Sequence, residues 1–340
     1  MNIPKVNLGF YPTPIYKLEK ISNELNQNIF IKRDDLTGIA FGGNKIRKLQ
    51  YFIADAIEQE AKALVTVGAP QSNHVRQTIA AGIKFGFDVH VALYKPEQTQ
   101  YQGNLLLDAL MGAHIHWIDS KNYYEEIIKI TGVLKDCHGK MPYFIPVGGS
   151  NEIGAWGYIS AAEEIAEQQK KLGLEFDYII IPSSSGGTQA GLIIGKKLHN
   201  LKAQIIGINI AKYAYADKTT LNSINTILHY FIEKHSIDYT FREQDIILIE
   251  KYNEPGYGIL TNDEKKTIAE LAKKEAIFLD PVYTARAFWA LIDLTKNNFF
   301  KNKANILFIH TGGTPAIFAY ANQLYNPPKP GEANKNILLE

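Results

Sequence analysis

A lysine that follows two glycines and opens an amphipathic segment is the residue of this sequence best suited to covalent chemistry. Lys45 comes after Gly42, Gly43 and Asn44, and apolar side chains then recur on one helical stripe, at Leu49, Phe52, Ile53, Ala56 and Ile57. The positive end of the helix dipole disfavours a charged lysine here. An amine neutralised as a Schiff base escapes that penalty, and the same helix end would attract a phosphate. An ordinary solvated lysine is the alternative interpretation.

A cluster of hydrogen-bonding side chains, Gln71-Ser72-Asn73-His74, follows a predicted strand that ends at Val67. A turn from strand to helix leaves backbone N–H groups free, and the side chains add further donors, so the cluster suits a carboxylate. Serine and asparagine are also among the best N-caps, so helix capping is the alternative. Capping needs only one such residue, which favours a binding role for the cluster.

Two further loops are rich in glycine and hydroxyl groups, and each follows a predicted buried strand. Residues 182–191 read PSSSGGTQAG, and such small residues let the backbone close around a phosphate. This loop lacks the lysine of a Walker loop and the spacing of a dinucleotide fingerprint, so we expect the phosphate of another cofactor. Residues 310–315 read HTGGTP. Since ligands gather at the carboxyl ends of strands in open α/β sheets, we expect these loops to share one site.

Two tyrosines, Tyr257 and Tyr283, stand among turn-forming residues, in PGYG and DPVYT respectively. The chain holds 19 tyrosines, most of which we expect to be packing residues. Only the flanking turn chemistry distinguishes these two.

The histidines offer little sign of a metal site. His114 and His116 share one face of a predicted strand, but no third ligand accompanies them, so we expect no bound metal. Cys137 and His138 lack a spaced partner and are expected to lie in a polar connection.

The elements that must position these loops are strands separated by helices. Continuous rather than alternating apolar runs indicate strands buried on both faces, as in parallel sheets covered by helices. Strands are predicted at 29–31, 63–67, 90–93, 114–118, 178–181, 205–210 and 306–309, and helices at 156–172, 188–199, 262–275 and 284–296. The predicted fold class is therefore α/β.

Composition favours a small-molecule enzyme or binding protein over other classes. The 340 residues are 46% hydrophobic and 21% charged, which is ample for a buried core. A net charge of +1 gives no support for a nucleic-acid or membrane partner. A single cysteine, no signal-like apolar segment near Met1 and no run of about 18 apolar residues predict a cytoplasmic protein.

Taken in order, these segments resemble the D-cysteine desulfhydrase / 1-aminocyclopropane-1-carboxylate (ACC) deaminase family. The resemblance rests on FGGNK with RKL at 41–49, QSNH at 71–74, SGGT at 185–188 and DPVY at 280–283, and runs from FYPTP at 10–14 to Tyr320. It implies a pyridoxal-phosphate enzyme of fold type II, like tryptophan synthase β, with two open parallel-type sheets. Residues 1–47 and 155–330 would form the large domain, 48–154 a small inserted domain bounded near 142–154, and 331–340 a tail. A homodimer and a small amino-acid substrate are also implied.

The resemblance assigns roles to individual residues. Lys45 would bind the cofactor covalently, and its phosphate would meet Lys48 and the loop residues Gly186, Gly187, Thr188, Gln189, Ala190 and Gly191. Asn73 would also meet the cofactor ring, and the substrate carboxylate would meet Gln71, Ser72, Asn73 and His74. The expected catalytic residues are Lys45, Ser72, Tyr257 and Tyr283.

Two threonines bear on which reaction of the family is expected. The ACC deaminases carry a glutamate directly after the second tyrosine and a leucine in the loop, where this chain has Thr284 and Thr311. A carboxylate keeps the cofactor's pyridine nitrogen protonated and makes the ring a strong electron sink, which cyclopropane opening needs. A threonine hydroxyl only donates a hydrogen bond, which suffices to expel a thiolate. The resemblance thus favours a carbon–sulfur lyase that converts D-cysteine to pyruvate, hydrogen sulfide and ammonia.

Three alternatives remain open at the level of the sequence. They are an ACC deaminase, an enzyme that eliminates from a related β-substituted acid such as cysteate, and a catalytically silent phosphate-ligand binder on the same fold. A nicotinamide-dependent dehydrogenase is disfavoured, because no predicted strand leads into G-x-G-x-x-G.

Overall fold

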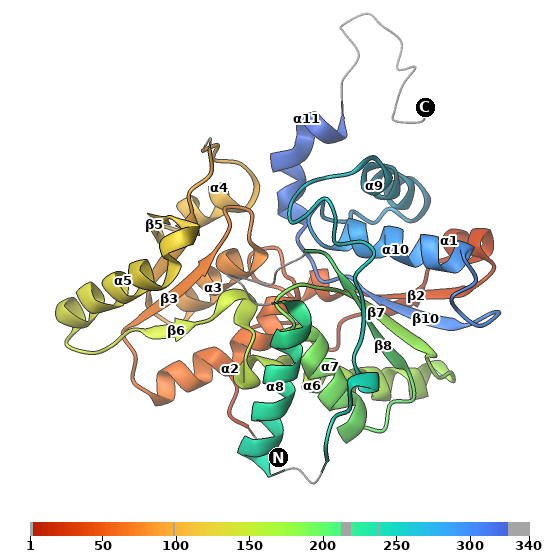
Figure 1. Ribbon diagram of the computed structural model, residues 1–340, viewed down its shortest axis with the longest axis horizontal. Helices are drawn as coiled ribbons and strands as arrows, with labels where there is room; N and C mark the ends of the chain where they lie inside the picture. The colour runs from red at the N-terminus through yellow and green to blue at the C-terminus, as the bar shows by residue number, and fades with distance from the viewer. Residues whose placement is uncertain (1–2, 98, 212–218, 237–238, 326–340) are drawn as a thin grey trace, which may run out of the picture.

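Two separate β-sheets carry the fold of this chain, whose computed structural model describes residues 3–97, 99–211, 219–236 and 239–325 (Figure 1). The larger sheet has the strand order β1-β2-β10-β7-β8-β9, and only β1 runs antiparallel to its neighbour. Its strands are β1 (Ile15–Lys17), β2 (Asn28–Lys32), β7 (Tyr178–Ser183), β8 (Gln204–Asn209), β9 (Ile247–Ile249) and β10 (Asn305–Ile309).

The smaller sheet is wholly parallel and has the order β5-β4-β3-β6. It consists of β3 (Ala63–Gly68), β4 (Asp88–Tyr94), β5 (His114–Ile118) and β6 (Tyr143–Ile145). Apolar side chains of this sheet pack against four helices, α2 (Asn44–Glu58), α3 (Asn73–Lys84), α4 (Gly103–Leu110) and α5 (Tyr123–His138). In Figure 1 these helices surround the small sheet on the left.

Helices cover both faces of the larger sheet, which explains the continuous apolar runs of its strands. Ile179 and Ile181 pack among α6 (Glu152–Leu172), α7 (Gly187–Leu198) and α8 (Thr220–His235). Ile180, between them, packs on the opposite face among α1 (Glu19–Leu25), α9 (Asn262–Glu275) and α10 (Thr284–Lys296). Because successive side chains of a strand point to opposite faces, both faces must be apolar.

A buried ionic cluster fastens α2 to the larger sheet and to α6. Arg47 Nη2 lies 2.8 Å from Asp34 Oδ1, and Arg47 Nη1 lies 2.9 Å from Glu164 Oε2. Lys32, on β2, contacts the same glutamate, with its Nζ 2.5 Å from Glu164 Oε1. Since Arg47 is two residues after Lys45, this cluster holds the first turns of α2, which carry the lysine.

The predicted α/β class is confirmed, and every predicted strand and helix is present. The bounds of α9 and α10 match the prediction, whereas α6 begins four residues before the predicted 156 because Asn151 caps it, its side chain accepting from Gly154 N at 2.9 Å. The short strands β1, β6 and β9 were not predicted. Placing Cys137 and His138 in a connection was wrong, since they are the last residues of α5.

The predicted domain division remains a prediction, and its cut after residue 47 falls inside α2. The predicted tail at 331–340 lies outside the described residues. None of the helices in the described ranges is both long and apolar enough to cross a membrane.

Candidate active site

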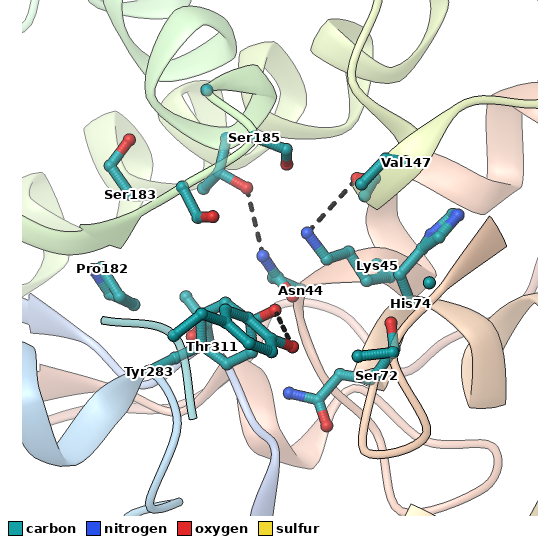
Figure 2. A pocket seen from close by; sticks show the side chains of 18 of the residues that line it. Asn44, Lys45, Ser72, His74, Val147, Pro182, Ser183, Ser185, Tyr283 and Thr311 are labelled. Atoms are coloured by element: carbon teal, nitrogen blue, oxygen red, sulfur yellow. Dashed lines mark hydrogen bonds between the residues drawn. The ribbon is translucent and has the colours of Figure 1, made fainter. Parts of the chain in front are cut away.

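A cavity of about 570 Å³ collects the loops that the sequence singles out (Figure 2). The loops belong to both sheets: the start of α2 and the β3–α3 and β7–α7 turns meet the segments of the two tyrosines and of Thr311. The lining residues are Asn44, Lys45, Gly68, Ala69, Ser72, Asn73, His74, Tyr94, Lys121, Tyr123, Tyr124, Val147, Gly148, Pro182, Ser183, Ser184, Ser185, Gly186, Thr188, Tyr257, Tyr283 and Thr311.

Lys45 reaches the cavity from the first turn of α2, and the two glycines before it make that position possible. Gly42 has φ +61°, and a Cβ there would lie 2.3 Å from the carbonyl oxygen of Asp35. Gly43, the N-cap, has φ +128° and donates its N–H to Thr37 Oγ1 at 2.7 Å. Figure 2 shows the Lys45 side chain directed to the backbone beside Val147, where its amine donates to Gly148 at 3.2 Å.

Lys45 and two basic groups near it, Lys48 and His74, have lowered pKa values. Burial lowers the pKa of Lys45 to about 8. Burial, and then the charge of Lys45, hold the pKa of Lys48 well below its usual range. Burial and the two lysines also depress the pKa of His74. The site therefore holds amines that give up their protons easily, as a lysine that reacts with a carbonyl group requires.

The turn before α7 has the donors and the space that a phosphate needs. A Cβ on Gly187 would lie 2.5 Å from Ser150 Oγ and 2.9 Å from Lys48 Nζ, so only a glycine leaves this cradle open. Ser150 Oγ accepts from Gly187 N at 3.2 Å and from Lys48 Nζ at 3.3 Å. It also lies 2.8 Å from Ser185 Oγ. An amine, hydroxyls and the first amides of a twelve-residue helix fit a cofactor phosphate.

The later residues of that loop are placed elsewhere. Gln189 donates to the carbonyl of Ile247 at 2.8 Å, and Gly191 packs on α6, where a Cβ would lie 2.5 Å from the carbonyl oxygen of Ala155. Ala190 is buried in the core beneath α7. The structure does not bring these side chains to the cavity, because successive residues of a helix point in different directions.

The β3–α3 turn serves both as a helix cap and as cavity wall. Ser72 is the N-cap of α3, and its Oγ accepts from Val75 N at 3.3 Å. Ser72, Asn73 and His74 also line the cavity, whereas Gln71 does not. Gln71 instead accepts from the N–H of Asn104 at 2.9 Å, which fastens the start of α4. Ser72 therefore caps α3, as the alternative interpretation has it, and also lines the cavity.

Two side chains of this turn show how it is held. His74 is buried, with its Nε2 2.7 Å from Thr66 Oγ1, while its Nδ1 has no partner among the described residues. Asn73 Oδ1 accepts from Arg76 at 3.3 Å, and Arg76 donates to the carbonyl of Gly42 at 2.8 Å. The buried Arg76 thus ties the turn to the glycines before Lys45, a role with no signal in the sequence.

Tyr257 and Tyr283 form a pair at the cavity although 26 residues separate them. Their hydroxyl oxygens lie 2.9 Å apart, and their rings meet edge to face with centroids 5.7 Å apart. Burial raises the pKa of both phenols, so both keep their protons near neutral pH.

The two threonines are placed differently. Thr311 lines the cavity, and its carbonyl accepts from Asn44 N at 2.9 Å. Thr284 is fully buried away from the cavity: its hydroxyl donates to Asp280 Oδ1 at 2.6 Å and accepts from Asp280 N at 2.7 Å. Among the described residues that line the cavity there is no aspartate or glutamate.

Part of the cavity wall comes from residues that sequence reasoning missed. Asn44, in the lysine motif itself, donates to Thr188 Oγ1 at 3.1 Å. The others are Gly68, Ala69, Tyr94, Lys121, Tyr123, Tyr124, Val147 and Gly148. They lie at the ends of β3 and β4, before and at the start of α5, and after β6, in segments without a motif, so only the fold reveals them.

Two covered parallel sheets, with a lysine and a phosphate-type turn at a shared cavity, define the class of pyridoxal-phosphate enzymes of fold type II. Residues 6–312 match the family described as "Pyridoxal-phosphate dependent enzyme", and the chain belongs to that family. It is a pyridoxal-phosphate-dependent lyase of the group that carries out eliminations and deaminations.

Curated relatives of two names match nearly the whole chain. The D-cysteine desulfhydrase of Serratia proteamaculans is 37% identical over 326 residues, covering 94% of this chain and 97% of the relative. A protein of Pyrococcus furiosus, provisionally named 1-aminocyclopropane-1-carboxylate deaminase, is 38% identical over 323 residues, covering 94% and 95%. The two names leave the substrate undecided between them.

Solved structures agree on the fold. The crystal structure of an ACC deaminase homologue has a TM-score of 0.86 at 37% identity and covers 95% of each chain. Threonine deaminase isoform 2 of Solanum lycopersicum has a TM-score of 0.62 at 19% identity, covering 92% of this chain and 82% of that one. The second likeness concerns the fold alone.

Proposed function

We propose that this enzyme catalyses α,β-elimination on D-cysteine, with one water consumed and pyruvate, hydrogen sulfide and ammonia released. The observation that carries the proposal is a cavity whose described lining includes Thr311 but no carboxylate. The names of several relatives supply the stereochemistry of the proposed substrate.

Lys45 is the proposed catalytic base. When bound, pyridoxal phosphate would supply an electron sink that stabilises negative charge at the substrate's Cα, and the proton there would pass to the free Lys45 amine. With a pKa of about 8, the Lys45 amine is partly unprotonated near neutral pH, so its Nζ can accept the α-proton. Its hydrogen bond to the Gly148 carbonyl, at 3.2 Å, holds the amine at the cavity wall.

The start of α3 is the proposed binding site of the substrate carboxylate. The first amides of a helix have no partner within the helix, and their positive dipole end attracts an anion. The Ser72 hydroxyl and the Asn73 amide line the cavity at this helix start. We assign them to hold the carboxylate and the cofactor ring.

Tyr257 and Tyr283 are the proposed proton donors to the leaving group. A thiolate that leaves the β-carbon gains negative charge, which a neutral phenol can stabilise by donating its O–H. Both phenols keep their protons because burial raises their pKa. Since the two hydroxyls lie 2.9 Å apart, one phenol can donate its O–H to the sulfur while the other phenol donates its O–H to the first phenol's oxygen.

Thr311, rather than Thr284, is the proposed partner of the cofactor's pyridine nitrogen. The Thr284 hydroxyl already has both of its strong interactions with Asp280. A hydroxyl that donates to an unprotonated nitrogen leaves the ring a moderate electron sink, which is sufficient for loss of a thiolate. Opening an unactivated cyclopropane requires a stronger electron sink, so the ACC deaminase alternative is disfavoured.

The test is a substrate panel with the purified holoenzyme. We expect sulfide and pyruvate in equal amounts from D-cysteine, and much less from L-cysteine. ACC would release α-ketobutyrate, and D-cysteate would release sulfite in place of sulfide. The Lys45→Ala variant and an enzyme-free mixture with cofactor are the controls. Sulfide no higher than in these controls overturns the proposal.

A further inference from the structure

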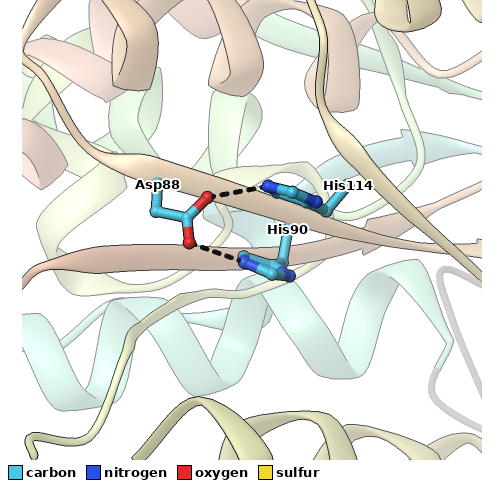
Figure 3. A group of neighbouring side chains, drawn as sticks. All are labelled: Asp88, His90 and His114. Carbon is cyan, nitrogen blue, oxygen red and sulfur yellow. Dashed lines mark hydrogen bonds and ion pairs between the residues drawn. The ribbon is translucent and has the colours of Figure 1, made fainter. Parts of the chain in front are cut away.

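A second group of chemically active side chains gathers at the far end of the small sheet. Asp88 and His114 are the first residues of β4 and β5, and His138 is the last residue of α5. His90 is paired directly with His114 in the parallel register of the two strands. Figure 3 shows the rings of both histidines turned to the Asp88 carboxylate.

Three imidazole nitrogens converge on that one carboxylate. His90 Nε2 lies 3.0 Å and His138 Nε2 3.2 Å from Asp88 Oδ2, and His114 Nε2 lies 3.1 Å from Asp88 Oδ1. The ligand atoms of Asp88, His90 and His114 all lie within 4.8 Å of one another. In a tetrahedral zinc site with bonds of about 2.0–2.1 Å, neighbouring ligand atoms are roughly 3.3 Å apart. The three distances from Asp88 to the histidine nitrogens, 3.0 to 3.2 Å, are close to that separation, and the group within 4.8 Å consists of Asp88, His90 and His114.

A further histidine orients the cluster as supporting residues do at metal sites. His90 is buried, and its second nitrogen, Nδ1, lies 2.9 Å from His116 Nε2. A metal-binding histidine usually has its other ring nitrogen held by a neighbour, which fixes the ring and its tautomer. The sequence shows no further side chain beside His114 and His116, whereas the structure brings Asp88 and His90 of β4 and His138 of α5 next to His114.

The cluster is remote from the active-site cavity. Tyr94, the last residue of β4, lines that cavity, whereas Asp88 is the first residue of the same strand. Seven residues of strand span roughly 20 Å at about 3.3 Å each. Residues of the cluster are not among those that line the cavity.

We propose that Asp88, His90 and His114 bind one divalent transition-metal ion of the zinc class, with His138 beside the Asp88 carboxylate. Neutral imidazoles with a carboxylate suit zinc, cobalt, nickel and copper, whereas magnesium and calcium prefer oxygen ligands. The ion would join the starts of the neighbouring strands β4 and β5, next to the end of α5. Its role would be to stabilise the small sheet rather than to take part in the reaction.

The test uses untagged holoenzyme carrying Cys137→Ser, because the exposed thiol of Cys137 is a competing ligand close to His138. Zinc is titrated against a coloured chelator after endogenous metal has been removed. We expect one zinc per chain, no competition by magnesium, and a higher melting temperature with zinc, since an ion that binds the folded state stabilises it. Cobalt at the same site should show the visible bands of a four-coordinate ion with nitrogen ligands.

Two variants locate the site. Asp88→Asn and His114→Asn alter partly exposed ligands, and each should weaken zinc binding by at least about tenfold. His229→Asn, which removes an exposed histidine on α8, is the matched control and should bind zinc as the parent does. Unchanged sulfide release by all three variants would show that they fold. No zinc binding by the folded parent, or equal binding by the parent and both ligand variants, overturns the proposal.

Discussion

Lys45 and Lys48 donate from successive turns of α2 to the same carbonyl oxygen, that of Gly148, at 3.2 and 3.0 Å. Two ammonium groups that share one acceptor repel each other, and burial takes both away from water. Burial lowers the pKa of both amines, and the charge of Lys45 lowers the pKa of Lys48 further. The relationship joins the proposed base to the proposed phosphate site, because Lys48 also reaches Ser150.

The lowered pKa of Lys45 predicts how cofactor uptake depends on pH. Only the unprotonated amine reacts with a carbonyl group, so the rate for the apoenzyme should rise about tenfold per pH unit below the pKa and level off above it. We expect the plateau to begin near pH 8, the pKa of Lys45. The measurement is the growth of the cofactor's absorbance band near roughly 410–430 nm. A rate that still rises steeply at pH 9.5 would contradict the prediction, and Lys45→Ala should form no such band.

Gly187→Ala should weaken cofactor binding. The new Cβ would lie 2.9 Å from Lys48 Nζ and 2.5 Å from Ser150 Oγ, so both groups would have to leave the phosphate cradle. Loss of one charge-assisted hydrogen bond, about 1.5–3 kcal/mol, corresponds to at least about a tenfold higher dissociation constant. Equilibrium dialysis against pyridoxal phosphate measures it. Gly132→Ala, on α5 with open space around it, is the control and should bind as the parent does.

Thr311→Val should slow the reaction without unfolding the protein. The substitution keeps the shape of the side chain but removes the hydroxyl proposed to face the pyridine nitrogen. We expect kcat for sulfide release from D-cysteine to fall roughly tenfold, from loss of about 1.4 kcal/mol of stabilisation. Thr311→Ser keeps the hydroxyl and should recover most of the rate. Equal kcat values for the valine and serine variants would remove Thr311 from this role.

Thr284→Val should have the opposite signature, a loss of stability. The Asp280 carboxylate would lose a donor at 2.6 Å, and the Asp280 N–H would lose its acceptor at 2.7 Å. An unsatisfied buried polar group costs about 1–3 kcal/mol, which should appear as a lower free energy of unfolding in urea. A folded Thr284→Val enzyme with normal stability but much reduced kcat would instead place Thr284 at the cofactor.

Asp34→Asn should destabilise the protein at neutral pH, because it removes a charge from the buried cluster around Arg47. Breaking a buried ion pair costs about 3–5 kcal/mol. Burial raises the pKa of Asp34, but Arg47, Lys32 and Tyr158 outweigh burial and lower it to about 2. A depressed pKa means that the stabilisation is present above pH 4 and is lost as the pH falls to 2. Urea unfolding should therefore show a difference in the free energy of unfolding between parent and variant that is smaller at pH 3 than at pH 7. An equal difference at both pH values would contradict a stabilising role for the ionised Asp34 carboxylate.

The sequence by itself determined the fold class, and it singled out Lys45 and the loops that the structure brings to one cavity. Those features are local: apolar strands bounded by turns, and glycines where the backbone needs positive φ, can be recognised within a few residues. Gly42, Gly43 and Lys45 are such a case. Their positions in the structure follow from backbone sterics next to the first turn of a helix.

Only the tertiary structure decided what each polar side chain faces. Thr284 and Thr311 look alike in the sequence, yet one is held by Asp280 and the other lines the cavity. Asp88 and His114 become neighbours because of the register of β4 with β5. Strand register and helix rotation are set by packing between segments distant in the chain, so no local pattern encodes them. Chemistry that depends on such pairs is visible only in the folded protein.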